Sequence, residues 1–227
     1  MTAPFSPALF EFLIDLDLNN RKDWFDANKA RYESDVREPA FAFIREVGER
    51  FLDVSPHFVA SDKKSGGSLM RVYRDTRFSK DKTPYKTNVG VHFRHEAGKD
   101  VHAPGFYVHL HPDDCFIGVG MWRPDSPSLR AIRDRIVAEP NRYRAIVDAP
   151  EFTDAFSLSG ASLKNAPRGF DKDHPLVDEL KRKDFIAVRH ITPEDVLRDD
   201  LIDFLMENLR TGAPLMGFLA EAVGHPF

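Results

Sequence analysis

The chain has 227 residues, of which 42% are hydrophobic and 30% charged, and its formal net charge is −4. A chain of this length buries roughly 70 to 75% of its unfolded surface, and this composition excludes a disordered or fibrous protein. The slightly acidic charge excludes binding of nucleic acid or anionic membranes through overall charge, so any anion site must be local.

The N-terminus and the single cysteine indicate the compartment. Residues 1–7 lack the basic and apolar regions of a signal peptide, and no apolar run approaches the roughly 18 residues of a membrane helix. Cys115 is the only cysteine, so no intramolecular disulfide can form. We expect a soluble cytoplasmic protein with no membrane partner, and the sequence indicates no oligomeric state.

The first third of the chain predicts helices. Ser6 and Pro7 are typical of a helix start, and apolar residues follow at helical spacing until the Asn pair at 19–20 ends the helix. A second helix is expected over about residues 21–36, and a third opens near Pro39. These apolar stripes are typical of helices that pack on a core.

The centre of the chain predicts a β-sheet. After the loop at 61–67, the spacing of apolar residues changes from a period of 3.6 to a period of 2. Pro112, Asp113 and Asp114 separate the last two candidate strands and indicate a hairpin, so the simplest arrangement is an antiparallel meander. The candidate strands cover residues 68–74, 88–95, 105–111 and 115–122.

Helical signals return in the second half. Helices are expected from Ser126 and from Pro140, a fifth strand over residues 185–191, and a helical C-terminal part that Pro193 opens and Pro214 interrupts. No repeat, low-complexity tract or linker is present. The sequence therefore predicts one α+β domain over residues 1–227, with a mostly antiparallel sheet packed by N-terminal and C-terminal helices.

Strand alternation gives the predicted sheet an apolar and a polar face. If the apolar residues share a core, the other face displays basic and aromatic side chains beside Gly118 and Gly120, which leave room for a ligand to approach the backbone. The alternative is that a helix crosses at the glycines and structural hydrogen bonds hold the polar groups. The polar face would consist of Arg71, Tyr73, His92, Arg94, Tyr107 and His109.

The most unusual stretch is residues 71–86, with six basic and two acidic residues in a protein of net charge −4. Arginine donates two parallel hydrogen bonds to a phosphate or carboxylate, and aromatic rings in the stretch offer stacking surface. We expect at least two of Arg71, Arg74 and Arg77 to converge on one cavity with Lys82 or Lys86. The alternative is a surface loop in which Asp75 and Asp81 pair with its cations. The remaining candidate ligand-binding residues here are Tyr73, Asp75, Lys80 and Tyr85.

Several segments resemble one known family. Residues 71–88 read RVYRDTRFSKDKTPYKTN, and 19–32 read NNRKDWFDANKARY; GFYVH at 105–109, GVG at 118–120 and PRGFDKDHP at 167–175 accompany them. This pattern resembles the conserved hypothetical proteins of bacteria and fungi catalogued as domain of unknown function 2461, from about Phe5 to Leu219. The resemblance implies one domain and suggests that the central segment marks the site. It implies no reaction, cofactor or catalytic residue.

Metal and cofactor chemistry find little support. His109 and His111 lie two apart on one strand, a spacing that chelates transition metals, but no third ligand accompanies them. The family often has an acidic residue at position 111, so the histidine there either replaces a carboxylate ligand or is polar surface. Cys115 is typical of a small core residue, and no phosphate-binding or nucleophile motif is present. We expect no metal and no cofactor.

Two classes of function follow from the basic segment. The first is a site that binds or acts on a phosphate-bearing or otherwise anionic small molecule; the second is a nucleic-acid or protein-interaction module on the same surface. A pocket needs converging side chains, whereas nucleic acid needs a basic track that extends further. The acidic remainder of the chain favours the pocket, and the sequence does not decide whether the protein is an enzyme.

Overall fold

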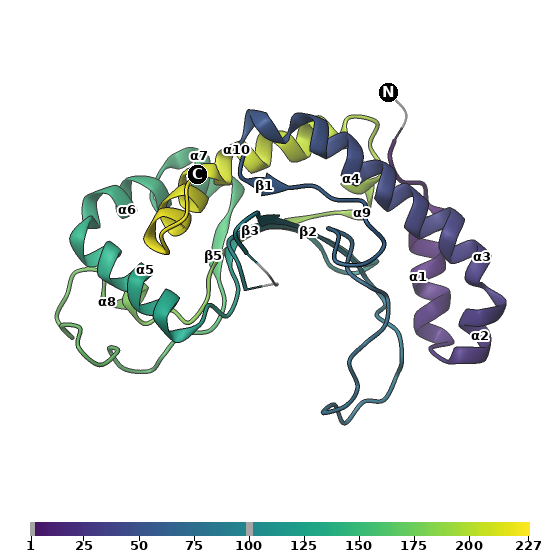
Figure 1. Cartoon of the computed structure of the whole chain (residues 1–227), viewed down its shortest axis with the longest axis horizontal. Coiled ribbons are helices and arrows are strands. Elements are labelled where there is room, and N and C mark those ends of the chain that lie inside the picture. The colour runs from purple at the N-terminus through teal and green to yellow at the C-terminus, as the bar shows by residue number, and fades with distance from the viewer. Residues whose placement is uncertain (1–2, 99–101) are drawn as a thin grey trace.

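An antiparallel sheet forms the centre of the molecule. The computed structural model describes residues 3–98 and 102–227, and within them six strands form one sheet in the order β1-β2-β3-β4-β6-β5 (Figure 1). The α+β class, the meander of β2 to β4 and the fifth predicted strand are therefore confirmed. The strands are β1 (Phe58–Val59), β2 (Val89–His95), β3 (Gly105–Leu110), β4 (Cys115–Met121), β5 (Ser157–Ser159) and β6 (Phe185–Ile191).

One face of the sheet packs beneath α4 (Glu38–Arg50) and α10 (Leu201–Ala222) (Figure 1). The alternate strand residues predicted to form the core, such as Val91 and Phe106, are fully buried there. Helix α10 crosses the sheet closely at Gly212, where a Cβ would lie 2.7 Å from a methyl of Val119. Within residues 3–98 and 102–227, no such helical layer covers the opposite face (Figure 1).

The N-terminal helices follow the predicted apolar spacing, with one difference. The expected second helix is broken at Asn28, whose side chain donates to the Trp24 carbonyl, and it then widens into a π-helical turn, Tyr32–Arg37, that runs directly into α4. Pro39 therefore lies in the first turn of α4 rather than at a separate start. The other helices of this part are α1 (Ala8–Leu18), α2 (Lys22–Ala27) and α3 (Lys29–Arg31), and a 3₁₀ turn covers Phe51–Asp53.

The C-terminal helices begin at the expected caps. The Asp125 side chain accepts from the Ser128 amide at 2.8 Å, and Thr192 and Asp195 form a reciprocal capping box. The predicted interruption at Pro214 is wrong, because α10 continues through this residue. No helix among the described residues is long and apolar enough to cross a membrane. These helices are α5 (Ser126–Ala138), α6 (Pro140–Val147), α7 (Pro150–Ala155), α8 (Val177–Leu180) and α9 (Pro193–Val196).

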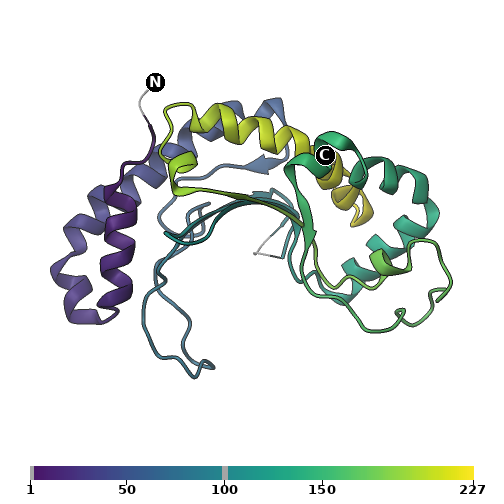
Figure 2. The same ribbon diagram turned by 180° about the vertical axis from the view of Figure 1, so that it is seen from behind.

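The predicted strand over 68–74 is wrong as a regular strand. It forms only isolated bridges, Leu69 with Val91 and Tyr73 with Tyr85. The chain then leaves the sheet and pairs with itself, with the Lys86 amide 2.7 Å from the Val72 carbonyl. We call residues 71–86 the basic hairpin; it extends away from the sheet on the side opposite α10 (Figure 1, Figure 2).

Candidate anion-binding pocket

The base of the basic hairpin is fixed to the N-terminal helices. The Asn20 side chain donates to the Tyr85 carbonyl and accepts from the Tyr85 amide, both at 3.0 Å, as a paired strand would. The Tyr85 ring stacks on Phe25 with centroids 4.1 Å apart and is buried. Tyr85, predicted as a ligand-stacking residue, is therefore a core residue, and its position brings the two segments together.

A pocket of about 180 Å³ lies between these segments. One wall comes from α2, α3 and the π-helical turn, and the other from residues 69–73 at the start of the hairpin. Cations and aromatic rings dominate the lining, and Glu33 is the one acid among the described lining residues. The lining residues are Phe25, Lys29, Tyr32, Glu33, Arg37, Phe41, Lys64, Leu69, Met70, Arg71, Val72 and Tyr73.

The charges around this pocket are not balanced. Arg37 forms an ion pair with Glu33, so the one acidic residue of the lining already has a partner. Among the described residues, Lys29, Lys64 and Arg71 have no ion pair or side-chain hydrogen bond. All three side chains are exposed, and together they place positive charge around one concavity.

The π-helical turn shapes one wall. Such wide turns are rare and frequently occur at functional sites. Here the turn places Tyr32, Glu33 and Arg37 on the pocket one turn after Lys29. Burial raises the pKa of Tyr32 to about 12, although Arg37 opposes the shift, so its hydroxyl stays protonated and can donate a hydrogen bond.

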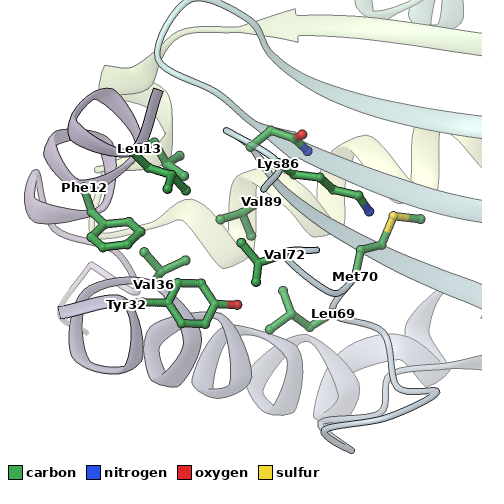
Figure 3. Close-up of a pocket in the computed structure, with 11 residues that line it drawn as sticks. Phe12, Leu13, Tyr32, Val36, Leu69, Met70, Val72, Lys86 and Val89 are labelled. Carbon is green, nitrogen blue, oxygen red and sulfur yellow. The ribbon is translucent and has the colours of Figure 1, made fainter. Parts of the chain in front are cut away.

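A narrow crevice adjoins the pocket and contains Lys86 (Figure 3). Its volume is about 10 Å³, enough for roughly one water. Tyr32, Leu69, Met70 and Val72 line both spaces, and the Lys86 ammonium points toward Met70 in Figure 3. Burial, and secondly the charge of Arg71, lower the pKa of Lys86. Lys86 therefore lies within electrostatic reach of the pocket.

Comparison with known proteins identifies the family of this chain. A model of a family of conserved hypothetical proteins, DUF2461, matches residues 8–218. The chain belongs to the DUF2461 family. Comparison with curated proteins and with solved structures gave no match. In this DUF2461 protein the two longest segments of the family resemblance, 19–32 and 71–88, meet at Asn20 and Tyr85 and together line the pocket.

The outer half of the hairpin does not contribute to the pocket. The Arg74 guanidinium bonds to Asp81 and Thr83, and Arg77 makes a two-point pair with Asp75 at 2.9 and 2.7 Å. The hydrogen bonds from the Arg77 side chain are the main cause that lowers the pKa of Asp75 to about 2. The pKa of Asp81 is also lowered to about 2, mainly by the hydrogen bond from the Thr83 amide and secondly by the one from Arg74. The expected convergence of two arginines is wrong, because the carboxylates of the hairpin itself hold Arg74 and Arg77.

The lysines of the hairpin separate in the same way. Lys82 donates to the Thr76 carbonyl at 2.8 Å and is tied to the loop, and Lys80 is exposed. Phe78, at the outer end of the hairpin, is 95% exposed, with the Arg77 guanidinium 5.8 Å from its ring centroid. Of the predicted cations, the structure brings Arg71 to the pocket and Lys86 beside it.

The other residues of the predicted polar face, His92, Arg94, Tyr107 and His109, do not line the pocket. The Tyr107 hydroxyl lies 3.3 Å from Nδ1 of His109, whose ring stacks on Phe116 at 4.6 Å. Burial raises the pKa of Tyr107 to about 12 and lowers that of His109. His92 lies buried against Tyr107, and Arg94 donates to the Gly66 carbonyl at 2.8 Å. His92, Tyr107 and His109 therefore contact one another in sequence, apart from the pocket.

The glycines of this face serve the protein's own packing. A Cβ at Gly90 would clash with the Tyr107 hydroxyl, and one at Gly105 with the His92 ring. Gly120 has φ +129°, and its Cβ would clash with the Phe185 carbonyl. Gly118 alone of the two predicted glycines has space, with its nearest neighbour at 3.7 Å. The main chain of β6 therefore fills the space expected at Gly120, whereas the space expected at Gly118 is present.

The histidine pair and the cysteine have local partners. His111 Nδ1 accepts from the Asp113 amide at 3.1 Å, and the described residues contain no cluster of three potential metal ligands. Cys115 is buried, as predicted, and its thiol donates to the His111 carbonyl at 3.0 Å.

The sequence interpretation missed three pocket cations, Lys29, Arg37 and Lys64. Lys29 and Arg37 are eight residues apart, with Glu33 midway, so they share one side of a helix. That spacing was readable in the sequence, but the side that faces the basic hairpin was not.

Proposed function

We propose that this DUF2461 protein binds a small anionic molecule, bearing a phosphate or carboxylate, in the pocket between the N-terminal helices and the basic hairpin. The observation that supports this most strongly is the unbalanced charge: Lys29, Lys64 and Arg71 border one pocket, and among the described residues none of them forms an ion pair. Arg71 supplies the planar pair of donors that fits a carboxylate or phosphate, and the lysines add charge.

The size of the pocket limits the ligand. Pockets for drug-sized ligands span roughly 300 to 1,000 Å³, and this one has about 180 Å³. It therefore accepts a small molecule or only the anionic end of a larger one. The aromatic lining, of which Tyr73 is 52% exposed, provides an apolar wall beside the charge.

The alternative is a nucleic-acid or protein-interaction module that uses the outer hairpin. The exposed Phe78 favours such a surface. Against a nucleic-acid track stands the neutralisation of Arg74 and Arg77 by Asp81 and Asp75, which leaves few free cations for phosphates.

A thermal-shift panel tests the proposal. A ligand that binds only the folded state stabilises it by about 2.7 kcal/mol at 100 times its Kd, which raises Tm by about 5 to 10 °C in a chain of this size. We expect such a shift with inorganic phosphate, sugar phosphates or short carboxylates. R71Q and K29Q should each lose most of it.

The matched control is R77Q, which removes a cation of the same hairpin outside the pocket and should keep the shift. Oligonucleotides should bind only in the roughly 10⁻⁴ to 10⁻⁶ M range and weaken steeply with salt. Submicromolar oligonucleotide binding at physiological salt, with no shift from any small anion, would refute the pocket and support the alternative.

A further inference from the structure

Lys86 is an unusual lysine in its surroundings. Its side chain is half-buried among apolar residues such as Leu13, Val36 and Val72, and among the described residues no carboxylate pairs with it. Lysines are seldom buried unless they are paired, because the ammonium loses its hydration without compensation. The neighbouring charge is Arg71, which repels the ammonium further. Structural stability does not account for this arrangement.

Such surroundings favour the neutral amine. A lysine that is desolvated in an apolar site or placed beside another cation becomes a nucleophile that condenses with carbonyl compounds. Both conditions hold for Lys86, and its pKa is lowered by burial first and by Arg71 second. The ammonium points toward Met70 in Figure 3, and Met70 lines both the crevice and the larger pocket.

We propose that Lys86 forms an imine with the carbonyl carbon of a small 2-oxo acid whose carboxylate is held by Arg71. The inference rests on the proposed anion site and names the substrate class for it. A 2-oxo acid carries its carbonyl next to its carboxylate, so a guanidinium and an amine within electrostatic reach of each other can bind both groups of one small molecule. The roughly 180 Å³ of the pocket suits a molecule of this size.

The chemical step needs no oxidant, reductant or metal. Lys86 releases one proton to water, and the neutral nitrogen attacks the carbonyl carbon; the C–N bond forms as the carbonyl electron pair moves to oxygen, which takes up a proton. The resulting carbinolamine loses that oxygen as water, and the C=N bond forms. Tyr32 lines both spaces, and its hydroxyl, with a pKa of about 12, remains available to donate a hydrogen bond to the oxygen.

Reductive trapping with pyruvate tests this inference. The whole protein is incubated with pyruvate and borohydride, and peptide mass mapping locates the 1-carboxyethyl groups that reduction leaves on lysines. We expect Lys86 to be modified at least about tenfold faster than the exposed Lys80 of the same hairpin, since it combines a bound substrate with an amine of lowered pKa. Lactate, which has no carbonyl, should leave no adduct, and R71Q should reduce trapping at Lys86.

The variant K86R keeps the positive charge but cannot form an imine. It should lose the adduct and keep the stabilisation by pyruvate, which shows that the fold and the anion site are intact. Stabilisation by pyruvate with Lys86 modified no faster than Lys80 would overturn this inference and leave the proposed function standing. If no small anion stabilises the protein and Lys86 is not selectively trapped, both fail.

Discussion

At the scale of single residues, the pocket depends on one asparagine. Asn20 lies between α1 and α2 and bonds both main-chain groups of Tyr85, so a side-chain amide replaces a strand partner. This contact joins the N-terminal helices to the basic hairpin, and the stacked pair of Tyr85 and Phe25 completes the joint. Together, the bonds of Asn20 and the stacked rings hold the two walls of the pocket in register.

We expect N20A to destabilise the protein by about 1 to 3 kcal/mol, because it leaves a part-buried amide and carbonyl of Tyr85 without partners. Anion-induced stabilisation should weaken as well, since the walls lose their alignment. Urea unfolding measures the free energy. The control N165A, at an exposed loop position, should stay within about 0.5 kcal/mol; an equally stable N20A would show that the joint is unimportant.

At the scale of elements, β4 carries two glycines, of which one has space for a side chain and the other does not. Gly118 meets nothing closer than 3.7 Å, whereas Gly120 has φ +129° and lies against the main chain of β6. The bend at Gly120 lets β4 follow β6 as it approaches Phe185. Backbone geometry, rather than a ligand, therefore explains this glycine.

The pair G118A and G120A tests that account. G120A should cost about 1 to 3 kcal/mol or more, because alanine is strained at this φ and its Cβ meets the carbonyl of Phe185. G118A should be nearly neutral, within about 1 kcal/mol. Thermal unfolding of both variants suffices. Equal losses at the two positions would contradict the distinction drawn between them.

The elements were predictable to the extent that their patterns are local. The period of two gave β2, β3, β4 and β6 nearly to the residue, whereas β1 and β5 have only two and three residues and show no period. The strand expected over 68–74 bonds β2 only at its start, through the Met70 amide and the Gly90 carbonyl; from Val72 onward the chain bonds residues 84–86 of the hairpin instead. Only part of the site was predictable from the sequence. Arg71 and Lys86 lie in the basic segment, whereas Lys29 and Lys64 come close to Arg71 only through long-range packing.

At the scale of the whole molecule, a stack of three histidines ties the C-terminal end to the sheet edge. The His95 ring lies between His225, with centroids 4.9 Å apart, and His57 at 5.7 Å. Its Nε2 donates to the Pro226 carbonyl at 2.8 Å while Nδ1 accepts from the Ala97 amide at 3.1 Å. Both ring nitrogens are satisfied only in the neutral form.

This stack predicts that stability falls on acidification. Burial is the main cause that lowers the pKa of His95 below 6.5, so the unfolded chain binds the proton more readily than the folded one. The stabilisation is complete above pH 6.5 and is lost as the pH falls through the folded pKa. The bond from His57 lowers the pKa of Glu96 as well, which adds a loss of the same sign at lower pH.

We therefore expect Tm to drop between about pH 7.5 and pH 5, and H95Q to have a lower Tm at neutral pH but a flatter profile. Some slope should persist, because burial also lowers the pKa of His109. Melting curves across this range provide the check. A profile for H95Q as steep as that of the unaltered protein would show that the stack does not control the pH dependence.

The central claim is that Lys29, Lys64 and Arg71 form an anion site, and diffraction from a crystal soaked in tungstate tests it most directly. Tungstate resembles phosphate in shape and charge, and its anomalous signal locates it without ambiguity. We predict a peak in the pocket within hydrogen-bonding distance of Arg71 and at least one of the two lysines, absent from crystals of R71Q. Tungstate bound only elsewhere, such as at the outer end of the basic hairpin, with the pocket free of it, would contradict the claim.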